Sequence, residues 1–143
     1  MLKKAAAAAL LILVALLIAP AASPVQISYV VSDSMSPTIA TNDGYVLVDT
    51  GAVEEGDIIT YYSEERGTAV THRAIDVTDD GIVTQGDANP STDQAAGYPL
   101  VQPADVSGTV LTVGGEPLRI PNPGVGVALL RRYWYVVGLL LAG

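Results

Sequence analysis

Short runs of β-favouring residues, separated by turn residues, fill the middle of the chain. Valine, isoleucine, threonine and tyrosine favour strands, whereas clusters of Gly, Asp and Asn favour turns. No helical period of apolar residues appears between residues 27 and 118. The sequence therefore predicts a mainly β domain. Its expected strands cover residues 45–48, 57–62, 69–77, 82–85 and 106–113, and the polar, proline-containing residues 86–103 are expected to form a long loop over the sheet.

Both ends of the chain are apolar. Residues 5–22 form an uncharged run behind Lys3 and Lys4, and this length is at the short end of a membrane-spanning helix. The two lysines would place the N-terminus in the cytoplasm and the rest of the chain outside. Hydropathy alone equally allows a cleavable signal peptide that ends near residues 19–22. Residues 133–143 are too few to span a bilayer, so a shortened second membrane segment, an interfacial segment and a piece of the core all remain open.

The composition excludes several kinds of site. The chain has no cysteine and one histidine, which excludes disulfides and thiolate sites and argues against zinc. Residues 27–118 hold all fifteen acidic residues and only two basic ones, Arg66 and Arg73, for a net charge of −13. Phosphate binding needs lysine and arginine, so nucleic acid is not expected as a partner.

A serine-containing loop is the first candidate for chemistry. Residues 31–38 read V-S-D-S-M-S-P-T and place the hydroxyls of Ser32 and Ser34 two positions apart. Pro37 disfavours a helix here, since it biases the preceding Ser36 toward an extended backbone. A serine nucleophile needs such a stiff loop, with backbone N–H groups beside its hydroxyl. Most such loops have no catalytic role, so the interpretation requires a base and a group that orients it.

A base for this serine can be found by elimination. Lys3 and Lys4 precede the apolar run and would lie across the membrane from Ser34, which excludes a Ser–Lys pair. His72 is then the remaining side chain of a type that titrates near neutral pH.

The predicted hairpin brings carboxylates close to His72. A turn centred on residues 79–80 pairs His72 with Asp87, and a turn centred on residues 80–81 pairs it with Asn89. Asp93 follows on the loop that could fold back over the imidazole. Asp87 and Asp93 are therefore both candidates to bind the second ring nitrogen, although aspartate is also common in turns for purely structural reasons.

Three motifs, read in this order and spacing, resemble type I signal peptidase. They are S-D-S-M-S-P-T at 32–38, T-H-R at 71–73 and Q-G-D-A-N-P-S-T-D at 85–93, and residues 56–57 and 119–121 with Gly124 add to the resemblance. The resemblance is to the archaeal and endoplasmic-reticulum branch, which uses histidine where the bacterial enzymes use lysine. It implies Ser34 as the nucleophile, His72 as the general base and Asp93 as the partner of the base.

The resemblance also implies supporting roles for neighbouring residues. Asp87 would help shape the site, Ser32 would assist at the oxyanion, and Met35 belongs to the same motif. No cofactor and no metal are implied. One departure is Asp33, which stands where the family commonly has glycine, and the chain also ends soon after Gly138.

The family's fold implies an all-β catalytic domain on an N-terminal transmembrane helix. The expected organisation is a cytoplasmic N-terminus and anchor over residues 1–24, an extracytoplasmic β domain over 25–121, and an apolar segment over 122–143 that is membrane-associated or not. The expected protein is a serine endopeptidase of the cell membrane, single-pass or two-pass. It would remove signal peptides from secretory preproteins after small residues at −1 and −3, with membrane partner subunits left open.

Two other functions remain open on the sequence. One is a self-cleaving peptidase of the same fold, akin to the LexA repressor, although that family uses a lysine base and carries a DNA-binding domain. The other is a membrane-anchored β module that binds a partner without catalysis, with Ser34 as an ordinary loop residue.

Overall fold

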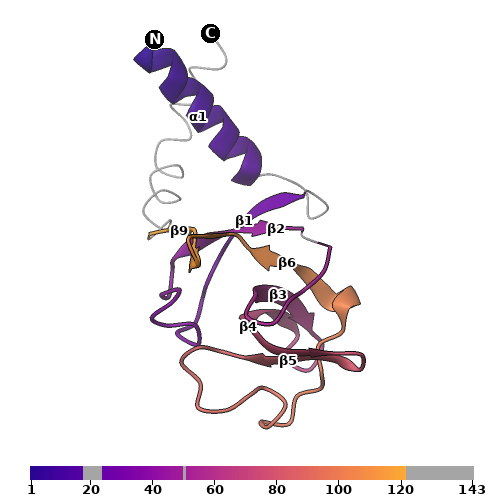
Figure 1. The fold of residues 1–143 in the computed structure, drawn as a ribbon. Coiled ribbons are helices and arrows are strands. Elements are labelled where there is room, and N and C mark those ends of the chain that lie inside the picture. Colours follow the sequence, from indigo (N-terminus) through magenta and orange to yellow (C-terminus); the bar gives the residue numbers. More distant parts are fainter. Residues whose placement is uncertain (18–23, 50, 122–143) are drawn as a thin grey trace.

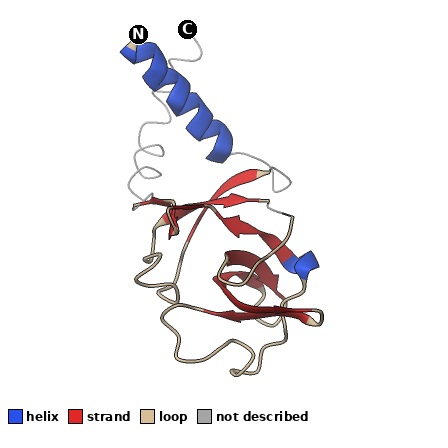
Figure 2. Ribbon diagram, viewed as in Figure 1, coloured by secondary structure: helices blue, strands red, loops and turns tan. Residues whose placement is uncertain are grey.

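A computed structural model of the chain describes residues 1–17, 24–49 and 51–121. It contains one α-helix, a β domain and one short 3-10 helix among these residues (Figures 1 and 2). The elements are α1 (Leu2–Leu17), β1 (Val25–Tyr29), β2 (Gly44–Val48), β3 (Ile58–Ser63), β4 (Thr68–Thr78), β5 (Gly81–Gln85), η1 (Pro103–Asp105), β6 (Val106–Val110), β7 (Thr112–Val113), β8 (Glu116–Pro117) and β9 (Arg119–Ile120).

The mainly β prediction is confirmed, and each expected strand has a counterpart. The expected strand over residues 106–113 is divided into β6 and β7. Strands β1, β8 and β9 are not predicted from the sequence. Two of them, β8 and β9, have only two residues each, which is too short to show an alternating pattern.

One antiparallel sheet organises the domain. Its strand order is β1-β2-β6-β3-β4-β5, with β9 also paired to β2, while β7 and β8 form a separate two-stranded ribbon. Strand β6 lies between β2 and β3, so it joins the N-terminal pair of strands to the β3–β4–β5 meander (Figure 1). The serine loop connects β1 to β2, and the meander carries His72, so this sheet brings the two parts of the site together.

Two buried clusters form the core. The first consists of Val30, Met35, Ile39, Tyr45, Leu47, Ile58 and Val110, and the second of Ile59, Tyr61, Val70, Ala74, Ile82 and Val101. Met35 of the serine loop and Ile39, which directly follows the loop, are fully buried in the first cluster. Burial of a side chain of this size stabilises the fold by about 1.5–3 kcal/mol, so Met35 anchors the loop to the core.

The β4–β5 hairpin corrects the predicted register at His72. Its turn is centred on residues 79–80, because Thr78 pairs with Gly81. An irregularity between Ala74 and Asp76 then changes the pairing by one residue, so Arg73 faces Gln85. The extra residue is a β-bulge, which the sequence pattern does not reveal. Asp87 and Asn89 therefore lie beyond the ladder, and neither is the cross-strand partner of His72.

Helix α1 extends away from the β domain (Figure 1), and its exposed apolar side chains include Leu2, Leu10, Leu11, Ile12 and Leu13. In the described ranges, no helix combines the length and the apolar character needed to cross a membrane. The membrane span expected over residues 5–22 continues past Leu17 into residues outside the described ones, and the expected C-terminal segment over 122–143 also lies outside them.

Candidate active site

The serine loop is fixed on both sides of Ser34. On the core side, Met35 is buried and its carbonyl accepts a hydrogen bond from the backbone N–H of Ile39 (2.9 Å). On the other side, the carbonyl of Ser34 accepts a hydrogen bond from the backbone N–H of Ala88 (2.8 Å). Ser34 itself is half-buried, so its hydroxyl is held in place and remains accessible. The neighbouring Asp33 is exposed.

His72 lies in the middle of β4, opposite Ile59 of β3, and only 3% of it is exposed. Its Nε2 atom is 3.2 Å from the Oγ atom of Ser34, and its Nδ1 atom is 2.6 Å from Oδ2 of Asp93. The imidazole therefore joins the serine loop to the long loop after β5. His72 pairs with Ile59 on the β3 side of its strand, and on the β5 side the ladder reaches the adjacent Arg73, so the strand that carries the ring is held on both sides.

Asp93 is held by donors from three strands and from the turn between β3 and β4. Besides His72, its Oδ2 atom accepts hydrogen bonds from the hydroxyls of Thr84 on β5 (2.6 Å) and Tyr61 on β3 (3.1 Å). Its Oδ1 atom accepts one from Nη2 of Arg66 (3.1 Å). The backbone N–H of Asp93 also donates to the carbonyl of Thr84 (2.8 Å), which lays this residue along β5.

These contacts fix the protonation of the site. Burial alone would raise the pKa of the Asp93 carboxyl, but the hydrogen bonds from His72 and Thr84 outweigh burial and lower this pKa to about 2. Burial is also the main reason that the pKa of Tyr61 is raised to about 12, so its hydroxyl stays a donor. An ionised Asp93 can only accept, so Nδ1 of a neutral His72 carries the hydrogen. Nε2 is then the acceptor, in position to take the hydroxyl proton of Ser34.

Ser32 continues this chain of hydrogen bonds. Its Oγ atom lies 3.0 Å from the Oγ atom of Ser34. Since the Ser34 hydroxyl donates to His72, the Ser32 hydroxyl is the donor in this second contact. Ser32 therefore places a hydrogen-bond donor beside the oxygen of Ser34.

Asp87 belongs to a neighbouring ion pair. Its two carboxylate oxygens accept hydrogen bonds from Nε and Nη2 of Arg73 (2.8 and 2.7 Å), and the Thr38 hydroxyl also donates to it (2.5 Å). The hydrogen bond with Arg73 is the main reason that the pKa of Asp87 is lowered. Thr38 ends the serine loop and Arg73 follows His72, so Asp87 ties these two segments together.

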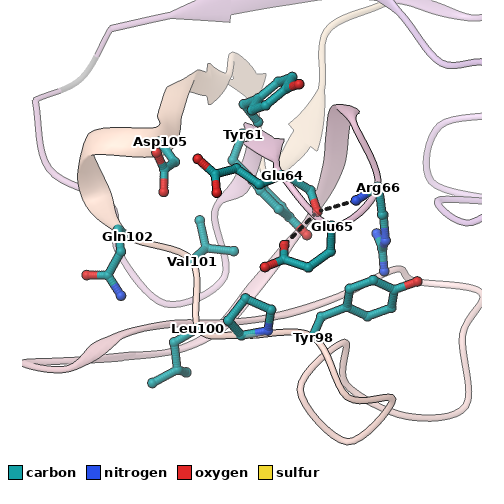
Figure 3. A pocket seen from close by; sticks show the side chains of 12 residues that line it. Tyr61, Glu64, Glu65, Arg66, Tyr98, Leu100, Val101, Gln102 and Asp105 are labelled. Atoms are coloured by element: carbon teal, nitrogen blue, oxygen red, sulfur yellow. Dashed lines mark hydrogen bonds between the residues drawn. The ribbon is translucent and has the colours of Figure 1, made fainter.

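A groove of about 410 Å³ lies along the site. It is lined by Tyr29, Val30, Val31, Ser32, Ser34, Arg66, Thr68, Ala69, Val70, Thr71, His72, Asn89 and Tyr98. A second cavity of about 300 Å³ adjoins it, with the acidic residues Glu64, Glu65 and Asp105 in its lining (Figure 3). Arg66 and Tyr98 line both, so they separate the groove from the second cavity.

The structure brings together Ser34, His72 and Asp93, with Ser32 and Asp87 beside them. Met35 lies next to Ser34 in the chain, and its side chain is buried in the first core cluster. Sequence reasoning does not find the three other partners of Asp93, which are Tyr61, Thr84 and Arg66. Tyr61 and Thr84 carry no local signal, because ordinary strands contain the same residue types. Arg66 does carry one: it and Arg73 are the two basic residues of an otherwise acidic stretch, and each binds one of the two carboxylates of the site.

A serine, a histidine and a buried carboxylate joined in this order can act as a nucleophile, a general base and the group that orients the base. No family model matches the chain. Among curated proteins, the chain is 34% identical over 83 residues to signal peptidase I W of Bacillus subtilis (strain 168). The match covers 53% of this chain and 43% of that protein, so the chain spans less than half the length of this relative. The similarity supports a relationship to signal peptidase I.

Proposed function

We propose that this chain is a membrane-bound serine endopeptidase that removes signal peptides from secretory preproteins. The observation that carries the proposal is the continuous hydrogen-bonded path from Ser34 through His72 to Asp93. The similarity to signal peptidase I W supports the same function from an independent direction. The histidine at the position of the base supports the further proposal that the chain belongs to the archaeal and endoplasmic-reticulum branch.

The proposed reaction is acyl transfer. His72 takes the proton of the Ser34 hydroxyl through Nε2 while Oγ attacks the scissile carbonyl carbon. The imidazolium then gives this proton to the leaving amine, and the signal peptide remains as an ester on Ser34. Water attacks the ester with His72 again as the base, and the free serine is restored. Asp93 stabilises the imidazolium in both steps through Nδ1.

The oxyanion would form beside the serine loop. The backbone N–H of Ser34 and the hydroxyl of Ser32 are the proposed donors to it. The 3.0 Å contact between the two Oγ atoms supports this role for Ser32, because a short rotation moves its hydrogen from Oγ of Ser34 to the adjacent oxyanion. Asp87 is proposed to hold the serine loop in a fixed position relative to β4, because it binds Thr38 of the loop and Arg73 of the strand.

The N-terminal segment is proposed to hold the catalytic domain at the membrane. Support comes from the exposed apolar side chains of α1 and from Lys3 and Lys4 at its start. The proposed topology has residues 1–24 as cytoplasmic N-terminus and anchor and residues 25–121 as the extracytoplasmic domain. A substrate threaded through the same membrane would meet the site there, with small residues at −1 and −3.

Labelling with a serine-acylating probe tests the site without assuming a substrate. The full-length chain in detergent is treated with the probe, and the modified peptide is located by mass spectrometry. We expect one adduct, on Ser34, that is absent from Ser34→Ala and much slower to form in His72→Ala. A chain that stays unlabelled would favour the non-catalytic binding module. Spontaneous loss of intact mass over time would instead favour self-cleavage.

A further inference from the structure

Arg66 connects three parts of the site. It lies in the turn between β3 and β4, where its backbone N–H donates to the Ser63 hydroxyl (3.3 Å). Its guanidinium donates to Oδ1 of Asp93 and lies 3.9 Å from the centroid of the Tyr98 ring. Figure 3 shows the Arg66 side chain pointing toward that ring, on the wall of the second cavity.

The two groups that Arg66 contacts are the ends of one short turn. The backbone N–H of Tyr98 donates to the carbonyl of Asp93 (3.1 Å), which closes residues 93–98 into a compact loop. One guanidinium therefore holds both ends of this loop against the β3–β4 turn. A planar guanidinium suits this task, because it can bind a carboxylate at its edge and an aromatic ring at its face.

Arg66 also sets the charge next to His72. Asp93 is buried and ionised, and Arg66 is the cation bound to its outer oxygen while His72 binds the inner one. Two other sets of ionisable groups lie around Asp93 and His72. One is Tyr61, whose neutral hydroxyl donates to Asp93, and the other is the Arg73–Asp87 ion pair. Asp33 next to the nucleophile, and Glu64 and Glu65 beside Arg66, are exposed.

We propose that Arg66 is a positioning residue, which holds Asp93 in line with His72 and offsets part of the negative charge that Asp93 presents to the imidazole. This inference rests on the proposed function. A cation near the imidazole disfavours the imidazolium, so Arg66 keeps more of His72 in the neutral form that acts as a base.

The single histidine allows a test that does not depend on cleavage. His72 is the only histidine of the chain, so the imidazole signals in an NMR titration belong to it alone. In Arg66→Met we expect the titration midpoint of the imidazole to rise by about 0.5 to 1 pH unit. The positive charge of Arg66, which offsets part of the negative charge of Asp93, is lost in this variant. In Arg66→Lys the midpoint should stay near that of the wild type, since the positive charge is kept.

Kinetics separate position from charge. In Arg66→Met we expect kcat at its pH plateau to fall about tenfold, and the acid limb of the pH–rate profile to move upward with the NMR midpoint. Arg66→Lys should restore the wild-type position of the acid limb but only part of kcat. An ammonium group can donate to Asp93, but it cannot at the same time stack on Tyr98 as the planar guanidinium does. Tyr98→Leu should lower kcat about two- to threefold and leave the acid limb of the pH–rate profile unchanged. It removes the contact between the Arg66 guanidinium and the aromatic ring but keeps the positive charge of Arg66.

Arg119→Met is the matched control. Arg119 also contacts a carboxylate, Oδ2 of Asp43 at 3.7 Å, but on β9 at the opposite end of the sheet order from β4 and β5. It should change neither the imidazole midpoint nor the pH–rate profile.

The outcomes distinguish this inference from the proposed function. If the wild type cleaves but Arg66→Met keeps the wild-type midpoint and profile, Arg66 is a structural link only and the inference is wrong. If Arg66→Met does not fold, Arg66→Lys decides, and full wild-type kcat in that variant would overturn the inference. A raised imidazole midpoint in a chain that cleaves no preprotein would leave the charge effect standing and count against the proposed function.

Discussion

A side-chain carbon on Gly86 would lie 2.6 Å from the carbonyl oxygen of Ser34, which is closer than such carbons approach a backbone oxygen. The same carbonyl accepts the N–H of Ala88 at 2.8 Å. The turn after β5 therefore packs directly against the backbone of the candidate nucleophile. Gly86 is needed here because only hydrogen fits between the two segments.

Gly86→Ala should displace the serine loop from His72. The clash is with backbone and cannot be relieved by a side-chain rotation, so we expect at least a tenfold loss of kcat together with a lower melting temperature. Gly114→Ala is the comparison, because it lies between β7 and β8 at positive φ with open space around it. It should lower the melting temperature through backbone strain and leave kcat near that of the wild type. Equal activity of Gly86→Ala and the wild type would show that the contact does not position Ser34.

Asp93→Asn should lower kcat by about 10³- to 10⁴-fold, since the amide can donate to His72 and so favour the wrong tautomer. It should also destabilise the fold, because the Asp93 carboxylate accepts hydrogen bonds from four side chains. With the pKa lowered from 3.8 to about 2, ionised Asp93 contributes on the order of 2 kcal/mol at neutral pH.

The sign of this contribution sets its pH dependence. Because the folded pKa is the lower one, the stabilisation is complete above about pH 4 and is lost as the pH falls through about 2. The gap in unfolding free energy between the wild type and Asp93→Asn should therefore narrow over that range. A gap that stays constant from pH 7 to pH 2 would mean that Asp93 is not the ionised group described here.

Asp87→Asn should reduce stability and activity together. Asp87 joins Thr38 of the serine loop to Arg73 of β4, and an amide cannot form the bidentate ion pair. The pair is partly exposed, so we expect a loss of about 1 kcal/mol and a smaller fall in kcat than for Asp93→Asn. Denaturant unfolding and kinetics on both variants check this. A folded, fully inactive Asp87→Asn beside an active Asp93→Asn would reverse the two roles.

His72→Lys imitates a lysine base and should be inactive near neutral pH. Asp93 lies 2.6 Å from Nδ1 of His72 and would hold a lysine in its charged form, which cannot accept the serine proton. Rates measured up to high pH, beside His72→Ala, check this expectation. Robust cleavage by His72→Lys at pH 7 would argue against a working contact between Asp93 and residue 72.

The strands of the β3–β4–β5 meander, β2, β6 and the three motifs are predictable because their signals are local, whereas β1, β8 and β9 are not. Strand pairing does not decide between Asp87 and Asp93, since the bulge between Ala74 and Asp76 lies between His72 and the hairpin turn and changes the register there. The resemblance favoured Asp93, and the path of the long loop along β5 is what places its carboxylate at the imidazole. Tyr61 and Thr84 could not be found from the sequence, because their role depends on which faces of β3 and β5 meet that loop.

The most direct test of the central claim is cleavage of a preprotein by the full-length chain in detergent, followed by sequencing of the new N-terminus. The wild type should cut once, after a position with small residues at −1 and −3, and Ser34→Ala should leave the preprotein intact while remaining folded. A preprotein that stays whole with the wild type, or one that Ser34→Ala cuts at the same bond, would contradict the assignment of Ser34 as the nucleophile of a signal peptidase.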